Sequence, residues 1–171
     1  MFIGHLPAGY ITAKLLLKKF ANTGITTRFF ILAAVLGAIA PDFDMFYFYL
    51  LDNRQNHHHT YWPHYPALWL TMLAASSVWF KLASKKSYAA LALIFSISGF
   101  IHMLLDSIVG DIWWFAPLID QPYALFTVEA VYKPWWLNFI LHWSFALEIL
   151  MFTWAIYLWH FKPSTSRNAP T

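Results

Sequence analysis

The stretch SYAALALIFSISGFIHMLLDSIV, residues 87–109, decides the fold. It carries no Asp, Glu, Lys or Arg before Asp106, and it is longer than the roughly 20 apolar residues that cross a bilayer core. The whole chain has the same character, with 60% hydrophobic and 11% charged residues, whereas about a quarter of the residues in a soluble protein are charged. The sequence therefore predicts an all-α integral membrane protein.

Further apolar segments lie on both sides of this one. Residues 135–161 predict a second clear crossing, and residues 64–83 a third whose start is softened by Pro63 and Pro66. Residues 28–40 end at Pro41 and suffice for a short crossing, which the aromatic run 45–51 could continue. Residues 6–20 read as a half-span or an interfacial helix. We expect a bundle of four to five transmembrane or partly inserted helices.

The domain organisation is simple. No Gly/Ser-rich linker, low-complexity tract or internal repeat divides the chain, so residues 1–161 are predicted to form a single helical membrane domain. Residues 162–171 read as a disordered cytoplasmic tail. The N-terminus lacks the pattern of a cleaved signal peptide and is kept as structure. Cysteine is absent, so any metal must be held by imidazole and carboxylate groups.

Charge is divided between the two ends of the predicted helices. Basic residues prefer cytoplasmic loops. Two connections and the C-terminal end are therefore predicted to be cytoplasmic. They hold Lys14, Lys18, Lys19 and Arg28; Lys81, Lys85 and Lys86; and Lys162 and Arg167. The opposite ends hold Arg54 and Lys133 but also Asp42, Asp44, Asp52, Asp106, Asp111, Asp120 and Glu129, with most of the Trp and Tyr. We expect the bacterial inner membrane, with these acidic ends outside. The pI near 9.1 then reflects topology, and no nucleic-acid partner is expected.

His102 and Asp106 are the most informative polar pair. Four residues apart on a helix, they lie on one face and can share a metal ion. An ionisable pair inside a membrane segment is costly, and it indicates a functional site. The plain alternative is a buried hydrogen bond that only joins helices.

Two further clusters fall on the same outer side. Asp42 and Asp44, in the sequence PDFD, are hard oxygen ligands for a divalent cation, although a solvated Pro-Asp turn would look the same. The run HHHTYWPH, residues 57–64, places four imidazoles in eight residues. His59 and His64 are five apart with Pro63 between them, so a loop must deliver them. At least one of His57 and His58 is expected to be an outer or exposed residue.

Single histidines complete the predicted outer face. His5 opens the first apolar segment, and its start points outward if that segment ends inside. His142 lies about two turns into the last segment and Glu148 lies deeper, on a different face of the helix. Of these two, His142 is the better candidate for the site. His160, on the basic side, reads as interfacial.

The order of these motifs carries a resemblance. Gly4-His5, Pro41-Asp42-Phe43-Asp44, His59 with His64, and His102-Met103-Leu104-Leu105-Asp106 followed by Pro117 resemble the motifs GH, PDxD, HRxxTHS and HxxxD. That order is typical of the YdjM-like family of membrane-bound proteins described as metal-dependent hydrolases. Thr60 here follows the first histidine of the pair directly, without the arginine or the later serine. HxxxD is also similar to a motif of zinc-dependent phospholipase C, whose HxxxE partner is missing. The resemblance implies a hydrolase with bound metal.

The residues then predict a mechanism. We assign metal binding to His5, Asp42, Asp44, His59, His64, His102 and Asp106, and catalytic, orienting or proton-transfer roles to Asp106, Asp111 and His142. These ligands exceed the need of one tetrahedral ion, so two ions are plausible. Zinc is the first expectation, with manganese, iron and magnesium as alternatives. A metal brings the pKa of its water near neutrality, so no separate nucleophile is needed. Residues 110–134 are long enough for a lid. The expected partners are the lipid bilayer and a lipid-like or phosphorylated small molecule.

Three other classes compete with this reading. Phosphatidic-acid phosphatases carry an arginine and an SGH histidine that this sequence lacks, and membrane di-iron oxygenases need more histidine boxes. A non-enzymatic divalent-metal carrier or sensor stays open, because a ligand set alone does not reveal turnover. A transporter would favour polar groups along a whole span, whereas the ionisable groups here stop near one side except Glu148.

Overall fold

The structure, a computed structural model, describes residues 3–161 and is helical. The expected cytoplasmic tail, residues 162–171, lies outside the described residues. Within residues 3–161 there is no β-strand beyond one isolated bridge between Ile112 and Tyr123. The α-helices are α1 (His5–Leu16), α2 (Thr27–Ile39), α3 (Asp44–Leu50), α4 (Pro66–Leu82), α5 (Ser87–Asp106), α6 (Trp136–Ile140) and α7 (Ser144–Phe161). Short 3-10 turns cover Leu17–Thr23, Pro41–Phe43, His58–Thr60 and Trp62–His64.

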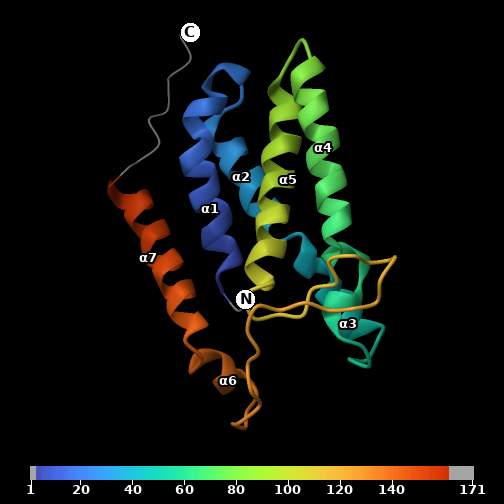
Figure 1. The fold of residues 1–171 in the computed structure, drawn as a ribbon. Helices are drawn as coiled ribbons and strands as arrows, with labels where there is room; N and C mark the ends of the chain where they lie inside the picture. The colour runs from blue at the N-terminus through green and yellow to red at the C-terminus, as the bar shows by residue number, and fades with distance from the viewer. Residues whose placement is uncertain (1–2, 162–171) are drawn as a thin grey trace.

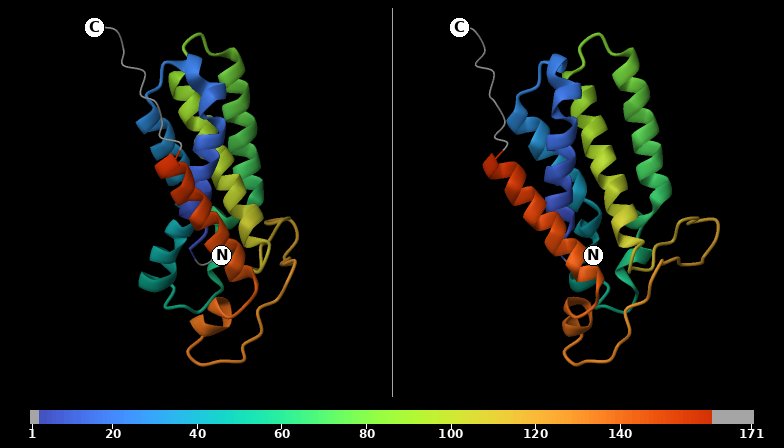
Figure 2. Two further views of the ribbon diagram at one scale, coloured as in Figure 1. Left: turned by 90° about the vertical axis from the view of Figure 1, so that its left-hand side faces the viewer. Right: turned by 60° about the vertical axis from the view of Figure 1, so that its left-hand side comes forward.

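The long helices run between two ends of the molecule (Figure 1). One end holds the end of α7 and the α1–α2 and α4–α5 connections, and these two connections carry Lys18, Lys19, Lys85 and Lys86. The other end holds the start of α1, the end of α5, α3, α6 and the segment that follows α5. Both views of Figure 2 show α3, α6 and that segment at this same end. The division of charge predicted from the sequence is therefore a division between the two ends of the bundle.

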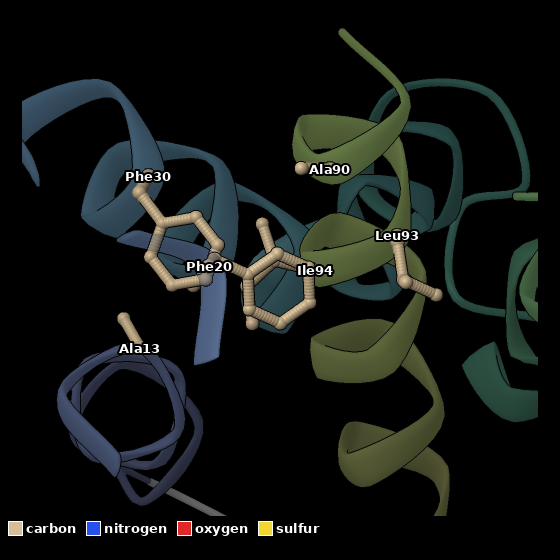
Figure 3. Close-up of a cluster of buried hydrophobic side chains, with 7 residues drawn as sticks. Ala13, Phe20, Phe30, Ala90, Leu93 and Ile94 are labelled. Carbon is tan, nitrogen blue, oxygen red and sulfur yellow. The ribbon is translucent and has the colours of Figure 1, made fainter. Parts of the chain in front are cut away.

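The core lies where α1, α2 and α5 pack together, toward the basic end. Ala13, Phe20, Phe30 and Ile94 are among its buried side chains (Figure 3), and the rings of Phe20 and Phe30 are 5.0 Å apart. Alanine leaves room for the aromatic rings, so large and small residues interdigitate at the density expected of a protein interior. This cluster holds α1, α2 and α5 together, and the opposite ends of these helices lie beside the predicted site residues.

Glycine allows α5 to approach its two neighbours. A Cβ on Gly37 of α2 would lie 2.2 Å from the Phe95 carbonyl oxygen of α5, and a Cβ on Gly99 would lie 1.9 Å from the Trp69 ring of α4. Both distances are far below van der Waals contact, so only glycine permits these crossings. The close approach of α2 to α5 places the end of α2 beside the last turns of α5.

Two or three of the four to five transmembrane or partly inserted helices expected from the sequence are long and apolar enough to span a membrane. Two helices, α5 and α7, are long and apolar enough to cross a membrane, and α2 with the Pro41–Leu50 segment is a third if this pair, bent by 56°, is one span. The expected crossing over residues 64–83 starts later, because Pro66 occupies the first position of α4 and the preceding residues form 3-10 turns. The expected crossing over 135–161 is divided into α6 and α7. Residues 6–20 end in a 3-10 helix after Leu16.

Candidate metal centre

Four chain segments distant in sequence deliver histidines and aspartates to the acidic end of the bundle. His5 opens α1, Asp42 follows α2, His59 and His64 lie in the two 3-10 turns before α4, and His102 and Asp106 occupy the last turns of α5. Five of these six side chains are buried, and Asp42 is partly exposed. Pro41 ends α2 and turns the chain, and Pro63 sets the bend that faces His64 inward.

Three ligand-type atoms lie at mutual distances that suit one ion, and a fourth lies near two of them. His64 Nε2 and His102 Nε2 are 3.4 Å apart, and Asp106 Oδ2 lies 2.9 Å from His102 Nε2 and 3.7 Å from His64 Nε2. Asp42 Oδ1 lies 3.6 Å from His102 Nε2 and 3.8 Å from His64 Nε2. Ligands of a tetrahedral zinc ion are about 3.3 Å apart, given metal–ligand distances of roughly 2.0 Å. These residues therefore fit a divalent ion.

The second nitrogen of each central histidine has its own partner. His102 Nδ1 lies 2.7 Å from the Ala38 carbonyl oxygen, and His59 Nδ1 lies 3.0 Å from the Asp111 carbonyl oxygen. His64 Nδ1 lies 2.5 Å from Asp44 Oδ2. Because these oxygens accept hydrogen bonds, each Nδ1 donates a proton and Nε2 is the nitrogen that faces the centre. Metal-binding histidines are oriented in this way.

Asp106 joins two sets of histidines. Its Oδ2 faces His59 Nε2 at 3.6 Å as well as His64 and His102, whereas Oδ1 lies 3.1 Å from His5 Nε2. The imidazole of His5 stacks on that of His102, with ring centroids 3.6 Å apart. A carboxylate whose two oxygens face different ligands can hold two ions.

Three overlapping groups of residues have ligand atoms close enough to share an ion. They are His64, His102 and Asp106; His5, Asp42 and His102; and His58, His59 and His64. His58 enters the third group, although nothing in the sequence distinguishes it from His57. Its proximity to His59, with ring centroids 4.0 Å apart, comes from the 3-10 turn His58–Thr60.

The histidines of the loop differ in their protonation. Burial lowers the pKa of His58 to about 3 and holds that of His59 well below its ordinary value, so both rings are neutral at pH 7. Burial also disfavours charge on His64, but hydrogen bonds to Asp106 and Asp44 outweigh it and raise the pKa of His64 to about 9. In the absence of metal, His64 therefore carries the proton that balances these carboxylates.

A cavity of about 610 Å³ opens beside the centre. Asp42, Asp106, Asp111 and the histidines 57–59 form its polar wall. The remaining wall is mostly apolar and comes largely from the segment after α5 and from α6, with Val109, Ala124, Phe126, Val128, Trp135 and Phe139. Residues of the segment 110–134, which the sequence suggested as a lid, thus line part of the cavity.

Backbone hydrogen bonds connect two parts of the segment that follows α5, residues 110–134. Ile112 and Tyr123 exchange hydrogen bonds of 3.0 and 2.9 Å, and the Trp114 indole donates to Ser107 Oγ at 2.8 Å. Gly110 lies at the start of the segment, where an added Cβ would come 2.8 Å from His59 Cε1. Glycine at this position lets the segment pass close to the histidine.

The structure also places Asp44, predicted as a metal ligand, Asp111 and His142, predicted as catalytic, and Glu148, whose role the sequence left open. Asp44 is in none of the three groups and contacts Nδ1 of His64, the nitrogen that faces away from the centre. The backbone carbonyl of Asp111 contacts His59, and Asp111 also lines the cavity. His142 contacts Ser144 and does not line that cavity. Glu148 is buried and accepts a hydrogen bond from the backbone N–H of Ile3, which ties α7 to the segment before His5.

Comparison with known proteins agrees with the order of the motifs. The family model described as YdjM inner membrane protein matches residues 1–165 of the chain. Neither the curated proteins nor the solved structures include a match. The match covers nearly the whole sequence and all six residues that meet at the acidic end. The chain therefore belongs to the YdjM inner membrane protein family.

Proposed function

We propose that this protein is a membrane-bound, metal-dependent hydrolase that acts on an ester or phosphoester of a lipid-like substrate. The observation that carries the proposal is the convergence of His64 Nε2, His102 Nε2 and Asp106 Oδ2 at spacings suited to one divalent ion, with Asp42 Oδ1 near both histidines. The mixture of imidazole and carboxylate ligands fits zinc, and manganese and iron accept the same ligand types. The contact of Asp106 Oδ1 with His5 supports a second ion beside the first.

The ion would act as a Lewis acid and would bring the pKa of water into the neutral range. The residues around it have separate tasks. Ala38, Asp44 and Asp111 fix the three central imidazoles through their Nδ1 atoms, so the geometry exists before ligands bind. Asp111 lines the cavity, and a carboxylate there can accept a proton from an attacking water molecule or orient it.

The shape of the cavity supports the substrate class. Its polar wall holds the ligand-type residues, and its apolar wall includes Phe126, Trp135 and Phe139. A substrate with a polar ester group and an apolar chain would place each part against matching side chains. The cavity also lies at the end of the bundle that is rich in tryptophan and tyrosine, which suits a substrate drawn from the membrane interface.

The orientation follows from the charges. The basic connections lie at the end opposite the centre, and such connections face the cytoplasm in inner membrane proteins. We place the centre on the outer side and the C-terminal end of α7 on the cytoplasmic side. In this arrangement α1 and α4 complete a bundle of four to five inserted helices around α5.

A hydrolysis screen tests the function. Metal-loaded protein is incubated with phospholipids, polyprenyl phosphates and generic phosphoesters, and release of product is measured for the wild type, Asp106→Asn and Asp120→Asn. Asp120 is exposed and accepts a hydrogen bond from the Trp113 indole, away from the centre, so its variant controls for the loss of a carboxylate. The proposal expects at least one substrate to be cleaved by the wild type and by Asp120→Asn but not by Asp106→Asn. Stoichiometric metal without turnover of any substrate would instead identify a metal carrier or sensor.

A further inference from the structure

A second cavity lies against Asp44. It has a volume of about 680 Å³ and is enclosed by α3, the 3-10 turn Trp62–His64, α4 and α5. Its lining is mostly apolar and aromatic and includes Tyr47, Trp62, Leu68, Met72 and Phe95. Asp44 carries the only formal charge among the described residues that line it. We call this cavity the Asp44 groove; it shares none of its lining residues with the cavity beside the metal centre.

Only one of the two carboxylate oxygens of Asp44 has a hydrogen-bond partner among residues 3–161. Its side chain is 2% exposed, and Oδ2 contacts His64 Nδ1 at 2.5 Å. Oδ1 is buried without a hydrogen-bond partner among residues 3–161. A buried carboxylate oxygen without a donor is costly, and such groups in native proteins normally have a partner. Asp44 lines the groove, so a ligand there that brings a donor would satisfy this oxygen once the carboxylate turns toward it.

The walls restrict what that ligand can be. Apart from Asp44 they offer apolar and aromatic surface, so a small hydrophilic molecule would gain little by entering. Tyr47 and Trp62 are 49% and 68% exposed, as is usual for aromatic residues at the depth of lipid head groups. A cationic N–H donor makes a stronger hydrogen bond to a carboxylate than a neutral donor does. We infer that the Asp44 groove binds a membrane amphiphile with a primary ammonium head group, whose N–H bonds Asp44 Oδ1.

The Asp44 side chain connects the groove with the metal centre, because it lines the groove and contacts His64. Asp44 holds His64, whose Nε2 faces the centre, so an ammonium group on Oδ1 would share the carboxylate that orients this histidine. The inference concerns binding alone and does not depend on the proposed hydrolysis.

Lipid capture tests the inference. The protein is reconstituted in vesicles with equal amounts of dioleoyl phosphatidylethanolamine and dioleoyl phosphatidylcholine, stripped of metal with EDTA, and purified in detergent. Mass spectrometry then gives the ratio of the two lipids that remain bound. These lipids share their tails and differ in the head group, where one has N–H donors and the other has none. We expect roughly tenfold enrichment of the ethanolamine lipid, as for one charge-assisted hydrogen bond.

Two variants and two matched controls localise the effect. Asp44→Asn replaces the free acceptor, and Leu68→Trp fills the groove while leaving Asp44 intact; both are expected to abolish the enrichment. Asp120→Asn and Leu70→Trp alter an exposed acid and an exposed leucine of α4 outside the groove, and both should retain it. Soluble ethanolamine should not displace the lipid, because it lacks the apolar chain.

Three results would overturn the inference. These are equal amounts of the two lipids on the wild type, enrichment that persists in Leu68→Trp, and displacement by soluble ethanolamine. If Asp44→Asn aggregates, Leu68→Trp against Leu70→Trp decides the question. Since the protein is metal-free throughout, the result is independent of any hydrolytic activity.

Discussion

The orientation of single imidazole rings determines what the centre can bind. His102 and His59 direct Nδ1 to backbone carbonyl oxygens, and His64 directs it to Asp44. The sequence predicted that His59, His64 and His102 belong to one site, because each falls at the same end of a predicted segment. It predicted Asp44 as a metal ligand, whereas in the structure this carboxylate contacts Nδ1 of His64. PDFD places two acids close together, but only the turn after α2 decides which carboxylate faces the centre and which lies behind His64.

Metal affinity should depend on pH through His64. Its pKa in the metal-free protein is about 9, since the hydrogen bonds to Asp106 and Asp44 outweigh the effect of burial. A metal ion at Nε2 must displace a proton below this pH, so affinity should rise from pH 7 to pH 9 by up to roughly tenfold per unit and then level off. Competition titration with a metal-binding dye measures this dependence. An affinity that does not change over this range would contradict the proposed protonation of His64.

The stability of the metal-free protein should change in the opposite direction. The pKa of His64 is raised above its ordinary value of 6.5, so its interactions with the two carboxylates contribute fully below about pH 6.5. That contribution is lost as pH rises through about 9, because the ring loses its charge. The two effects have a common origin and can be measured on the same preparation.

At the scale of the elements, the crossing of α2 and α5 connects packing with the site. Gly37 permits the crossing, and the next residue, Ala38, supplies the carbonyl oxygen that receives His102 Nδ1. The glycine lies within an unbroken apolar run, so its role in the crossing could not be predicted from the sequence. The need for glycine at position 37 comes from the packing of α2 against α5, which are distant in sequence.

Gly37→Ala should therefore weaken both the fold and the centre. The added Cβ would lie 2.2 Å from the Phe95 carbonyl oxygen, so α2 and α5 must separate. We expect a loss of about 1–3 kcal/mol in stability, together with reduced metal content because the Ala38 carbonyl oxygen moves from His102. Thermal unfolding in detergent and metal analysis measure the two effects. Leu36→Ala, one residue earlier and 41% exposed, is the control. Equal behaviour of the two variants would contradict this account.

The last apolar segment shows why its helix boundary was not predictable. Hydropathy is continuous over residues 135–161, and the sequence suggested one crossing. In the structure the chain leaves helical geometry between α6 and α7, where the backbone N–H of Ser144 lies 3.3 Å from His142 Nδ1. A side chain that accepts a backbone hydrogen bond competes locally with the helix. His142, which the sequence placed near the site, is therefore engaged with Ser144 at this break between the helices.

At the scale of the whole molecule, the separation of charge was predictable because it follows alternate ends of the apolar segments. Basic residues are found at one end of the bundle and the candidate ligands at the other. The number of spans was less predictable, because α1, α2 and α4 are shorter than the two clear spans and their ends depend on prolines and 3-10 turns. Length and hydropathy alone do not determine how such helices insert.

The proposed orientation can be measured directly because the chain has no cysteine. Ser84→Cys lies in the basic α4–α5 connection and Glu129→Cys in the segment over the cavity, and both positions are exposed. A maleimide that does not cross membranes should label the Glu129 variant in intact spheroplasts and the Ser84 variant only after lysis. Labelling of both variants from the same side would contradict the topology.

The central claim is that one buried cluster of histidine and aspartate binds a divalent metal. The direct test is the metal content of the protein purified in detergent from cells supplied with divalent metals, measured by mass spectrometry for the wild type, His102→Ala and His142→Ala. His102 Nε2 lies within 3.6 Å of His64, Asp42 and Asp106, whereas His142 contacts Ser144 at 2.9 Å. We predict stoichiometric metal in the wild type and in His142→Ala, and a severe loss in folded His102→Ala. A wild type without metal, or a His102→Ala variant that retains the full amount, would contradict the account.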